Sequence, residues 1–294
     1  MDLQYFVELF CGGLTRGSIY ALIALGYSMV YGTLRFINFA HGDIFMMAGF
    51  FMVYISASMP MAVAIPVVLI MTVALGLLIE RAAYKPLRSA PRMSVMISAI
   101  GVSYLLQNLA TYITGGLARP YPEIPFLKGT FMLGALKIKI ITVVTPLLTI
   151  LLVIALVLFI NHTKTGMAMR AVSRDFDTAR LMGIKVNNII SVTFIIGSFL
   201  AGVGSILYFS NYGQVSPTIG AMPGLKAFVA AVFGGIGSIP GAVLGAYIIG
   251  ICESLIKAND AIAIFSNAFT FALLILVLLF KPNGMFGEKL AEKV

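Results

Sequence analysis

The fold of this chain is decided by residues 44–79, IFMMAGFFMVYISASMPMAVAIPVVLIMTVALGLLI, which contain no charged residue. A helix needs roughly 20 apolar residues to cross the hydrocarbon of a bilayer. These 36 residues are therefore long enough for two spans. The segment Ser56-Ala57-Ser58-Met59-Pro60 in the middle is a natural place for a turn, because proline interrupts helical hydrogen bonding. We expect two membrane helices joined at residues 56–60.

The rest of the chain has the same character. Hydrophobic residues make up 60% of the 294 residues, charged residues 11%, and the mean hydropathy is +1.01. A soluble domain of this size needs more charged residues than this to cover its surface. In lipid, only helices pair every backbone group within one segment. We expect an all-α polytopic membrane protein, a single domain over 1–294, with about eight transmembrane helices. The other uncharged windows are 17–34, 93–117, 140–161, 186–225, 227–252 and 261–280.

The window 227–252 is interrupted. Residues 233–241, FGGIGSIPG, form a poor helix interior because glycine and proline destabilise it. Such breaks are tolerated at membrane depth where they line a cavity or are buried in protein. We therefore expect a broken or re-entrant segment here, with Gly234, Gly235 and Gly237 as candidates for a pathway lining. Two short pieces in place of one helix also bring the C-terminus to the cytoplasm, which its three lysines favour: Lys281, Lys289 and Lys293.

Basic residues mark the cytoplasmic loops. The loop 80–92 carries four basic residues against one acid, and residues 162–186 are also rich in lysine and arginine. Cytoplasmic loops of membrane proteins have this bias, so both loops are expected inside and Met1 outside. The net charge of +9 is concentrated in such loops, which makes nucleic acid an improbable partner and membrane lipid the expected surroundings.

Residues 162–186 form a polar island between uncharged windows. Ser173 or Asp175 can cap a short helix that Gly183 ends. An ordinary cytoplasmic loop and an amphipathic helix lying on lipid headgroups are alternative interpretations. A docking surface for a cytoplasmic partner is the third. The residues that would form this surface are Ser173, Asp175, Asp177, Thr178, Ala179, Arg180, Leu181 and Gly183.

This island resembles the coupling loop of ABC-importer permeases. In those proteins a Glu-Ala-Ala run is followed by glycine; here Asp177 and Thr178 stand in place of the glutamate and first alanine, before Ala179 and Gly183. The chain as a whole, from about residue 12 to 287, resembles the LivH-type permeases. Its departures are Asp43, where glutamate is commoner, and Lys281 and Asn283. The blocks that carry the resemblance are INFAHGD (37–43), ERAAYKPLR (80–88), ISAIG (97–101), LKAF (225–228), GGIGSIPGA (234–242) and KPNG (281–284).

The resemblance implies the permease subunit of an ATP-driven importer of branched-chain amino acids, in the bacterial inner membrane. Its partners would be a LivM-like sister permease, two cytoplasmic ABC ATPases and a periplasmic substrate-binding protein. Related systems carry urea or short amides, so that substrate class stays open. The sequence has no P-loop, nucleophile elbow or paired-histidine metal motif. We expect no catalysis, metal or cofactor in this chain, with ATP-Mg on the partner ATPases.

Six polar residues in or beside the spans are further candidates for a pathway or gate: Tyr27, Asn38, His41, Asp43, Gln107 and Asn108. In the structural interpretation, Asn38 caps a helix and Asp43 places a favourable negative charge near the N-terminus of that helix. Gating by His41 and Asp43 is the functional one. Tyr27 shares a helix face with Tyr20 and Tyr31, which is more typical of packing. For Gln107 and Asn108, interhelical hydrogen bonds explain the sequence as well as substrate contact does.

An ion-coupled secondary transporter is the main rival, followed by a channel-like facilitator and a membrane scaffold. We expect no carboxylate within the central spans, which argues against ion coupling. Small residues at intervals of four, at Gly197, Ala201 and Ser205 and at Gly241 and Gly245, predict two close helix contacts.

Overall fold

The computed structural model describes residues 3–88, 90–133, 136–281 and 284–286. The described chain is a helical bundle with two small antiparallel sheets, β1 with β4 and β2 with β3. Six helices are long and apolar enough to cross a membrane, and α2, α9 and α12 are shorter apolar helices. This makes the chain an all-α polytopic membrane protein. The helices are α1 (Leu3–Leu34), α2 (His41–Ser56), α3 (Met61–Ile79), α4 (Arg92–Thr114), α5 (Ile140–His162), α6 (Lys164–Arg174), α7 (Phe176–Leu181), α8 (Val186–Tyr212), α9 (Ala221–Gly234), α10 (Ile239–Lys257), α11 (Asp260–Ala263) and α12 (Ser266–Phe280).

Short elements connect the helices. A π-helical turn and a 3-10 turn, η1 (Glu80–Tyr84) and η2 (Lys85–Leu87), follow α3, and a second 3-10 turn, η3 (Pro125–Leu127), lies before the hairpin. The strands are β1 (Arg119–Pro120), β2 (Thr130–Leu133), β3 (Leu136–Lys139) and β4 (Gln214–Val215). The hydropathy windows did not predict these strands: β1, β2 and β3 lie outside the windows, and β4 lies in the part of window 186–225 that follows α8.

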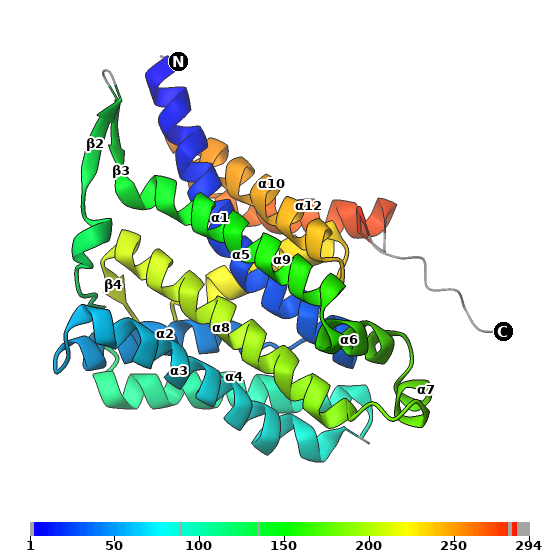
Figure 1. The fold of residues 1–294 in the computed structure, drawn as a ribbon. Helices are drawn as coiled ribbons and strands as arrows, with labels where there is room; N and C mark the ends of the chain where they lie inside the picture. Colours follow the sequence, from blue (N-terminus) through cyan, green and yellow to red (C-terminus); the bar gives the residue numbers. More distant parts are fainter. Residues whose placement is uncertain (1–2, 89, 134–135, 282–283, 287–294) are drawn as a thin grey trace.

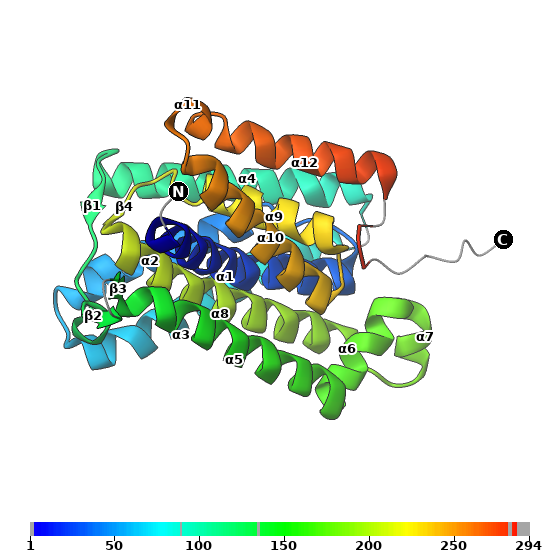
Figure 2. The same ribbon diagram turned by 90° about the horizontal axis from the view of Figure 1, so that it is seen from above.

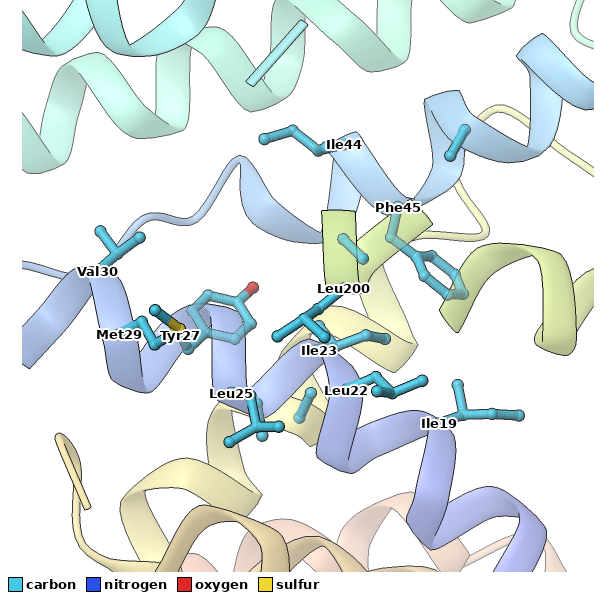
Figure 3. Close-up of a cluster of buried hydrophobic side chains, with 14 of the residues drawn as sticks. Ile19, Leu22, Ile23, Leu25, Tyr27, Met29, Val30, Ile44, Phe45 and Leu200 are labelled. Atoms are coloured by element: carbon cyan, nitrogen blue, oxygen red, sulfur yellow. The ribbon is translucent and has the colours of Figure 1, made fainter. Parts of the chain in front are cut away.

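Helix α1 is the centre of the bundle and packs on α10, α8 and α9 (Figures 1 and 2). Its middle turns are fully buried against α2 and α8, in a cluster of apolar side chains that includes Leu22, Phe45 and Leu200 (Figure 3). The sequence window for this helix began at residue 17. The helix instead begins 14 residues earlier, at Leu3, because its first turns are exposed and tolerate Glu8.

The contact between α1 and α10 is made by backbone on backbone. A Cβ atom on Gly17 would lie 2.8 Å from the Cα of Tyr247, and one on Gly250 would lie 2.3 Å from the backbone nitrogen of Gly17. No larger residue fits at either position. The two predicted small-residue contacts are also present, because Gly197 faces Gly26 of α1, and Gly245 faces the carbonyl of Ala230 in α9.

The breaks that the sequence predicted lie where expected. α2 and α3 are separated by residues 57–60, and α9 and α10 by residues 235–238. Gly234 packs on Gly241 and Ala230 on Gly245, so α9 and α10 run antiparallel as two separate helices. The turn between α9 and α10 contains two glycines with positive φ, 104° at Gly235 and 95° at Gly237. A residue with a side chain is strained in that conformation.

The bundle has two distinct ends (Figures 1 and 2). β2 and β3 lie at one end, and α6 and α7 project from the other. The described residues of the loop 80–88 lie at the α6–α7 end, since Arg88 donates a hydrogen bond to Asn187 at the start of α8. Phe286 and Arg170 line one hollow, so the described C-terminal residues share that end too, as the basic residues favoured. Lys289 and Lys293, and Met1 at the other terminus, lie outside the described residues.

Candidate functional site

The predicted docking surface is built from two helices, α6 and α7, which we call the α6–α7 surface. Thr163 caps α6, where its hydroxyl oxygen accepts a hydrogen bond from the backbone nitrogen of Gly166 at 3.0 Å. Met169 and Val172 are buried on the bundle side of α6, whereas Arg170 is exposed. The helix is thus amphipathic and lies against the bundle with its charged face outward.

Asp175 caps α7, as the sequence predicted. One of its carboxylate oxygens accepts hydrogen bonds from the backbone nitrogens of Asp177 and Thr178, at 2.9 and 3.0 Å. Gly183 ends this segment with a φ of 81° and with open space around it. Ser173, the alternative cap, does not cap α7. It lies inside α6, and its hydroxyl donates to the carbonyl of Arg170 at 2.8 Å.

The tip of α7 presents apolar side chains to the surroundings. Leu181 and Met182 are 87% and 78% exposed, whereas Ala179 is buried against the bundle. Arg180 and Asp177 lie 3.9 Å apart on the exposed side, a weak pair at such exposure. Two large apolar residues at a projecting tip, surrounded by charges, are typical of a surface that a partner covers.

A polar contact fastens this surface to the bundle, and further polar contacts fix the neighbouring segment 80–88 to α8. Arg35, the first residue after α1, donates from Nη2 to the carbonyl oxygen of Ser173 at 2.7 Å. Arg88 donates to the buried carboxylate of Glu80, which also accepts from the hydroxyl of Ser191 in α8 at 3.1 Å. Burial lowers the pKa of Arg88, and the neighbouring Glu80 partly restores it. Movement of α6 is therefore linked directly to α1, through the contact of Arg35 with Ser173.

The second group of predicted residues surrounds the start of α2. Asn38, His41 and Asp43 are all buried. The expectation that Asn38 caps this helix was wrong, because α2 begins at His41 with Ala40 at the cap position and without a side-chain cap. The side-chain oxygen of Asn38 instead accepts a hydrogen bond from the hydroxyl of Tyr84 at 2.5 Å. A partner 46 positions away in sequence competes successfully with the local cap.

Asp43 faces α4. Its carboxylate accepts a hydrogen bond from Nε2 of Gln107 at 3.0 Å, and the same amide lies 3.2 Å from the hydroxyl of Ser103. Gln107 thus makes the interhelical hydrogen bond that was one of its two interpretations. Asn108 points the other way, is exposed, and donates to the carbonyl of Tyr104 in its own helix at 2.8 Å. The two neighbours in sequence point in directions about 100° apart on α4, so one contacts α2 and the other is exposed.

His41 and Tyr27 pack together. Their ring centroids are 5.1 Å apart, and the Tyr27 ring also contacts Phe228 of α9. A Cβ atom on Gly26 would lie 2.1 Å from Nε2 of the histidine, so the imidazole occupies the space that this glycine leaves. These contacts favour the packing interpretation of the tyrosine stripe.

The short helices α2 and α9 meet at their beginnings. A Cβ atom on Gly224 would lie 2.9 Å from the Cα of Gly42, and one on Gly220 would lie 2.3 Å from its carbonyl oxygen. Both helices are preceded by irregular segments, residues 35–40 and 216–220. Short apolar helices that follow irregular segments and meet inside a bundle are typical of a transporter core.

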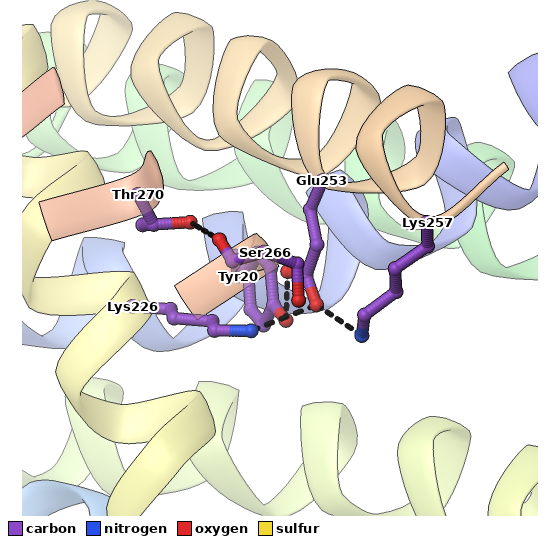
Figure 4. Close-up of polar contacts among 6 residues, drawn as sticks. All are labelled: Tyr20, Lys226, Glu253, Lys257, Ser266 and Thr270. Atoms are coloured by element: carbon purple, nitrogen blue, oxygen red, sulfur yellow. Dashed lines mark hydrogen bonds and ion pairs between the residues drawn. The ribbon is translucent and has the colours of Figure 1, made fainter. Parts of the chain in front are cut away.

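An ion cluster joins α9, α10 and α1 (Figure 4). The Glu253 carboxylate accepts hydrogen bonds from Lys226 at 2.7 Å, Lys257 at 2.5 Å and the hydroxyl of Tyr20 at 2.8 Å. Glu253 is 1% exposed. Sequence reasoning missed this cluster, because the windows were drawn to end at charged residues. The expectation that no carboxylate lies in a span was wrong, since α10 extends through Glu253 to Lys257.

The predicted pathway glycines form the turn between α9 and α10. This turn borders a hollow of about 700 Å³ between the ends of α1, α5, α6 and α12. The hollow is lined by Arg35, Arg170 and Arg174 together with apolar side chains such as Ile236 and Phe286. Within the described ranges no group of three His, Cys, Asp or Glu residues is placed to hold a metal ion.

Comparison with known proteins finds matches over nearly the whole chain. The family model for the permease component of branched-chain amino acid transport systems matches residues 9–278. The chain is 40% identical to the high-affinity branched-chain amino acid transport system permease protein BraD of Pseudomonas aeruginosa, over 100% of this chain and 99% of BraD. It is 39% identical to LivH of Escherichia coli K12, over 99% and 98% of the two chains. It is 28% identical to a probable LivH of Methanocaldococcus jannaschii, over 94% and 91%. No solved structure matches the chain.

Proposed function

The chain belongs to the family of branched-chain amino acid transport permeases, and from that premise we propose that it carries leucine, isoleucine and valine inward across the bacterial inner membrane. It is the non-catalytic, multi-pass subunit of an ABC importer. The energy comes from two cytoplasmic ATPases that bind ATP-Mg, and a LivM-like sister permease completes the membrane part. A periplasmic binding protein delivers the substrate.

The proposed topology follows from the basic loops and the breaks. The segment 80–91, the α6–α7 surface and the C-terminus lie in the cytoplasm, which the arginine and lysine residues there support. The six long helices and the short helix α12 cross the membrane, and α2 and α9 each cross after an irregular entry segment. This arrangement retains the broken segment that the glycine run predicted.

The observation that carries the proposal is the exposed tip of α7. Leu181 and Met182 offer an apolar contact to an ATPase, while the Asp175 cap keeps the short helix rigid. When the ATPases close on ATP, they push on α7, and the push passes through α6 to α1 by the contact of Arg35 with Ser173. The importer then changes from outward-open to inward-open.

Substitution of Gly183 tests this coupling. Gly183→Ala strains the backbone, because φ is 81°, yet its Cβ meets open space, so the damage is confined to the end of α7. We expect leucine uptake per ATP hydrolysed to fall severalfold in proteoliposomes with the complete importer. Gly213→Ala is the matched control, since Gly213 has a φ of 75° and equally open space at the opposite end. Equal losses in both variants would refute the coupling role.

Cross-linking tests the docking itself. Met182 and Met132 are both 78% exposed, at opposite ends of the bundle. In a background without Cys11 and Cys252, we expect Met182→Cys to cross-link to an ATPase carrying an introduced cysteine and Met132→Cys to give none. An absence of ATPase adducts at residue 182 in the assembled importer would overturn the proposal.

Substrate competition tests the cargo. Labelled leucine uptake by the complete importer should be inhibited by isoleucine and valine and left unchanged by urea or short amides. The reverse pattern would assign the chain to the amide-carrying systems of the same importer class. Uptake by this chain alone under an ion gradient would assign it to the secondary transporters.

A further inference from the structure

Helix α4 combines two properties that conflict in a lipid environment. Only 22% of its apolar window is buried, similar to the 28% of α3 and the 17% of α5. Its mean hydropathy is 1.4, however, against 2.8 for α3 and 3.0 for α5, and it is close to the 1.3 of the central helix α1. α4 thus has the polarity of a helix that protein covers and the exposure of a helix that lipid covers.

Part of this polarity lies on one outward face of α4, whereas Gln107 contributes from the side that contacts α2. Gly101, Tyr104, Asn108 and Thr111 recur at intervals of three and four, and all four are exposed. Asn108 lies about 8 Å from the midpoint of the helix, well within the hydrocarbon of a bilayer roughly 30 Å thick. We call these four residues the α4 face.

The α4 face leaves hydrogen-bonding capacity unused. Asn108 donates once, to the carbonyl of Tyr104, and the hydroxyl of Thr111 donates to the carbonyl of Gln107 at 2.8 Å. Within the described part of the chain, the amide oxygen of Asn108 and the hydroxyl of Tyr104 have no hydrogen-bond partner. Unpaired polar groups in hydrocarbon are costly, so lipid chains are an unfavourable neighbour for this face.

The geometry of the face suits another helix. Gly101 has no atom within 4 Å of its would-be Cβ, so a partner backbone can approach closely there. The side of α4 next to this face is anchored in this chain, because Gln107 donates to Asp43 of α2. The face therefore has a fixed orientation, and only its outward half is available.

We propose that the α4 face is the contact surface for the sister permease, whose transmembrane helix supplies a hydrogen-bonding partner for Asn108. This rests on the proposed function, which requires two permease subunits. A soluble ATPase or a periplasmic protein cannot reach the depth of Asn108, and lipid chains offer no hydrogen bonds. A membrane-spanning partner satisfies both conditions.

Photo-cross-linking in the complete importer tests the proposal. Tyr104 and Leu105 are both 64% exposed but point about 100° apart on the helix. Leu151 on the apolar helix α5 is 61% exposed. With benzoylphenylalanine at each position in native membranes, we expect adducts with the sister permease at position 104 and lipid adducts alone at 151, with at least fivefold less protein adduct at 105. Lipid adducts alone at 104, or adducts with a second copy of this chain, would overturn the proposal.

A substitution series gives a second measurement. Asn108→Leu removes the polar group and should weaken retention of the sister permease on purification roughly three- to fifteenfold, the range for one interhelical hydrogen bond. Asn108→Gln should restore it. Unchanged retention in Asn108→Leu would also contradict the proposal. Failure of the proposed function itself is recognised separately, because then the wild-type complex neither imports leucine nor binds the ATPases.

Discussion

The bundle buries one carboxylate at each of its two short inner helices, α2 and α9, and the two carboxylates have different hydrogen-bond partners. Glu253 contacts two lysines and a tyrosine hydroxyl and connects α10 to α9 and α1. Asp43, at the start of α2, contacts the uncharged amide of Gln107. A buried carboxylate that contacts two lysines, as Glu253 does, holds the helices that carry these residues together. A charge with neutral partners constrains the structure far less.

The largest effect is expected from removing the better-compensated carboxylate. Glu253→Ala leaves Lys226 buried without its partner, and we expect a loss of about 3–5 kcal/mol in the free energy of unfolding. Denaturant titration in nanodiscs measures it. The double variant with Glu253→Leu and Lys226→Leu should recover most of the loss, because Lys257 is partly exposed and can turn to water. A Glu253→Ala variant as stable as wild type would remove the distinction between the two carboxylates.

An intermediate effect is expected at Asp43. Asp43→Leu leaves the Gln107 amide without its acceptor, and we expect a loss of about 1–3 kcal/mol in the free energy of unfolding. Asp43→Asn keeps an acceptor oxygen and should leave both stability and leucine uptake within twofold of wild type. If Asp43→Asn instead abolishes uptake in a folded importer, the carboxylate belongs to the transport pathway.

The smallest effect is expected at an exposed carboxylate, which serves as the baseline. Asp177 pairs with Arg180 at 3.9 Å on the surface of α7. Asp177→Asn should change the free energy of unfolding by about 0.5 kcal/mol or less, because water screens such pairs. A change as large as that of Asp43→Leu would show that α7 is packed more tightly than its exposure indicates.

Local patterns in the sequence predicted the elements that local chemistry controls. The turn at residues 57–60, the break after Gly234, the Asp175 cap and the stop at Gly183 each depend on residues within one turn of the feature. The predicted cap by Asn38 failed because Tyr84, distant in sequence, is the stronger partner.

Long-range contacts were beyond such reasoning. The Glu253 cluster exists only because α9 and α10 fold back on each other beside α1. A span defined as an uncharged window cannot contain Glu253, so the sequence windows did not include this cluster. The link between Arg35 and Ser173 likewise joins residues 138 positions apart. Asp43 and Glu253 are similarly buried but looked unlike in sequence, since Asp43 is the last residue of the block at 37–43 and Glu253 lies just beyond the window 227–252.

The glycine contact between α1 and α10 has a mechanical consequence. With no side chain between Gly17 and Gly250, the two helices cannot slide or rotate past each other without a backbone collision. They behave as one rigid body through the middle of the subunit. The hinge for opening and closing must then lie where the outer helices contact this α1–α10 pair.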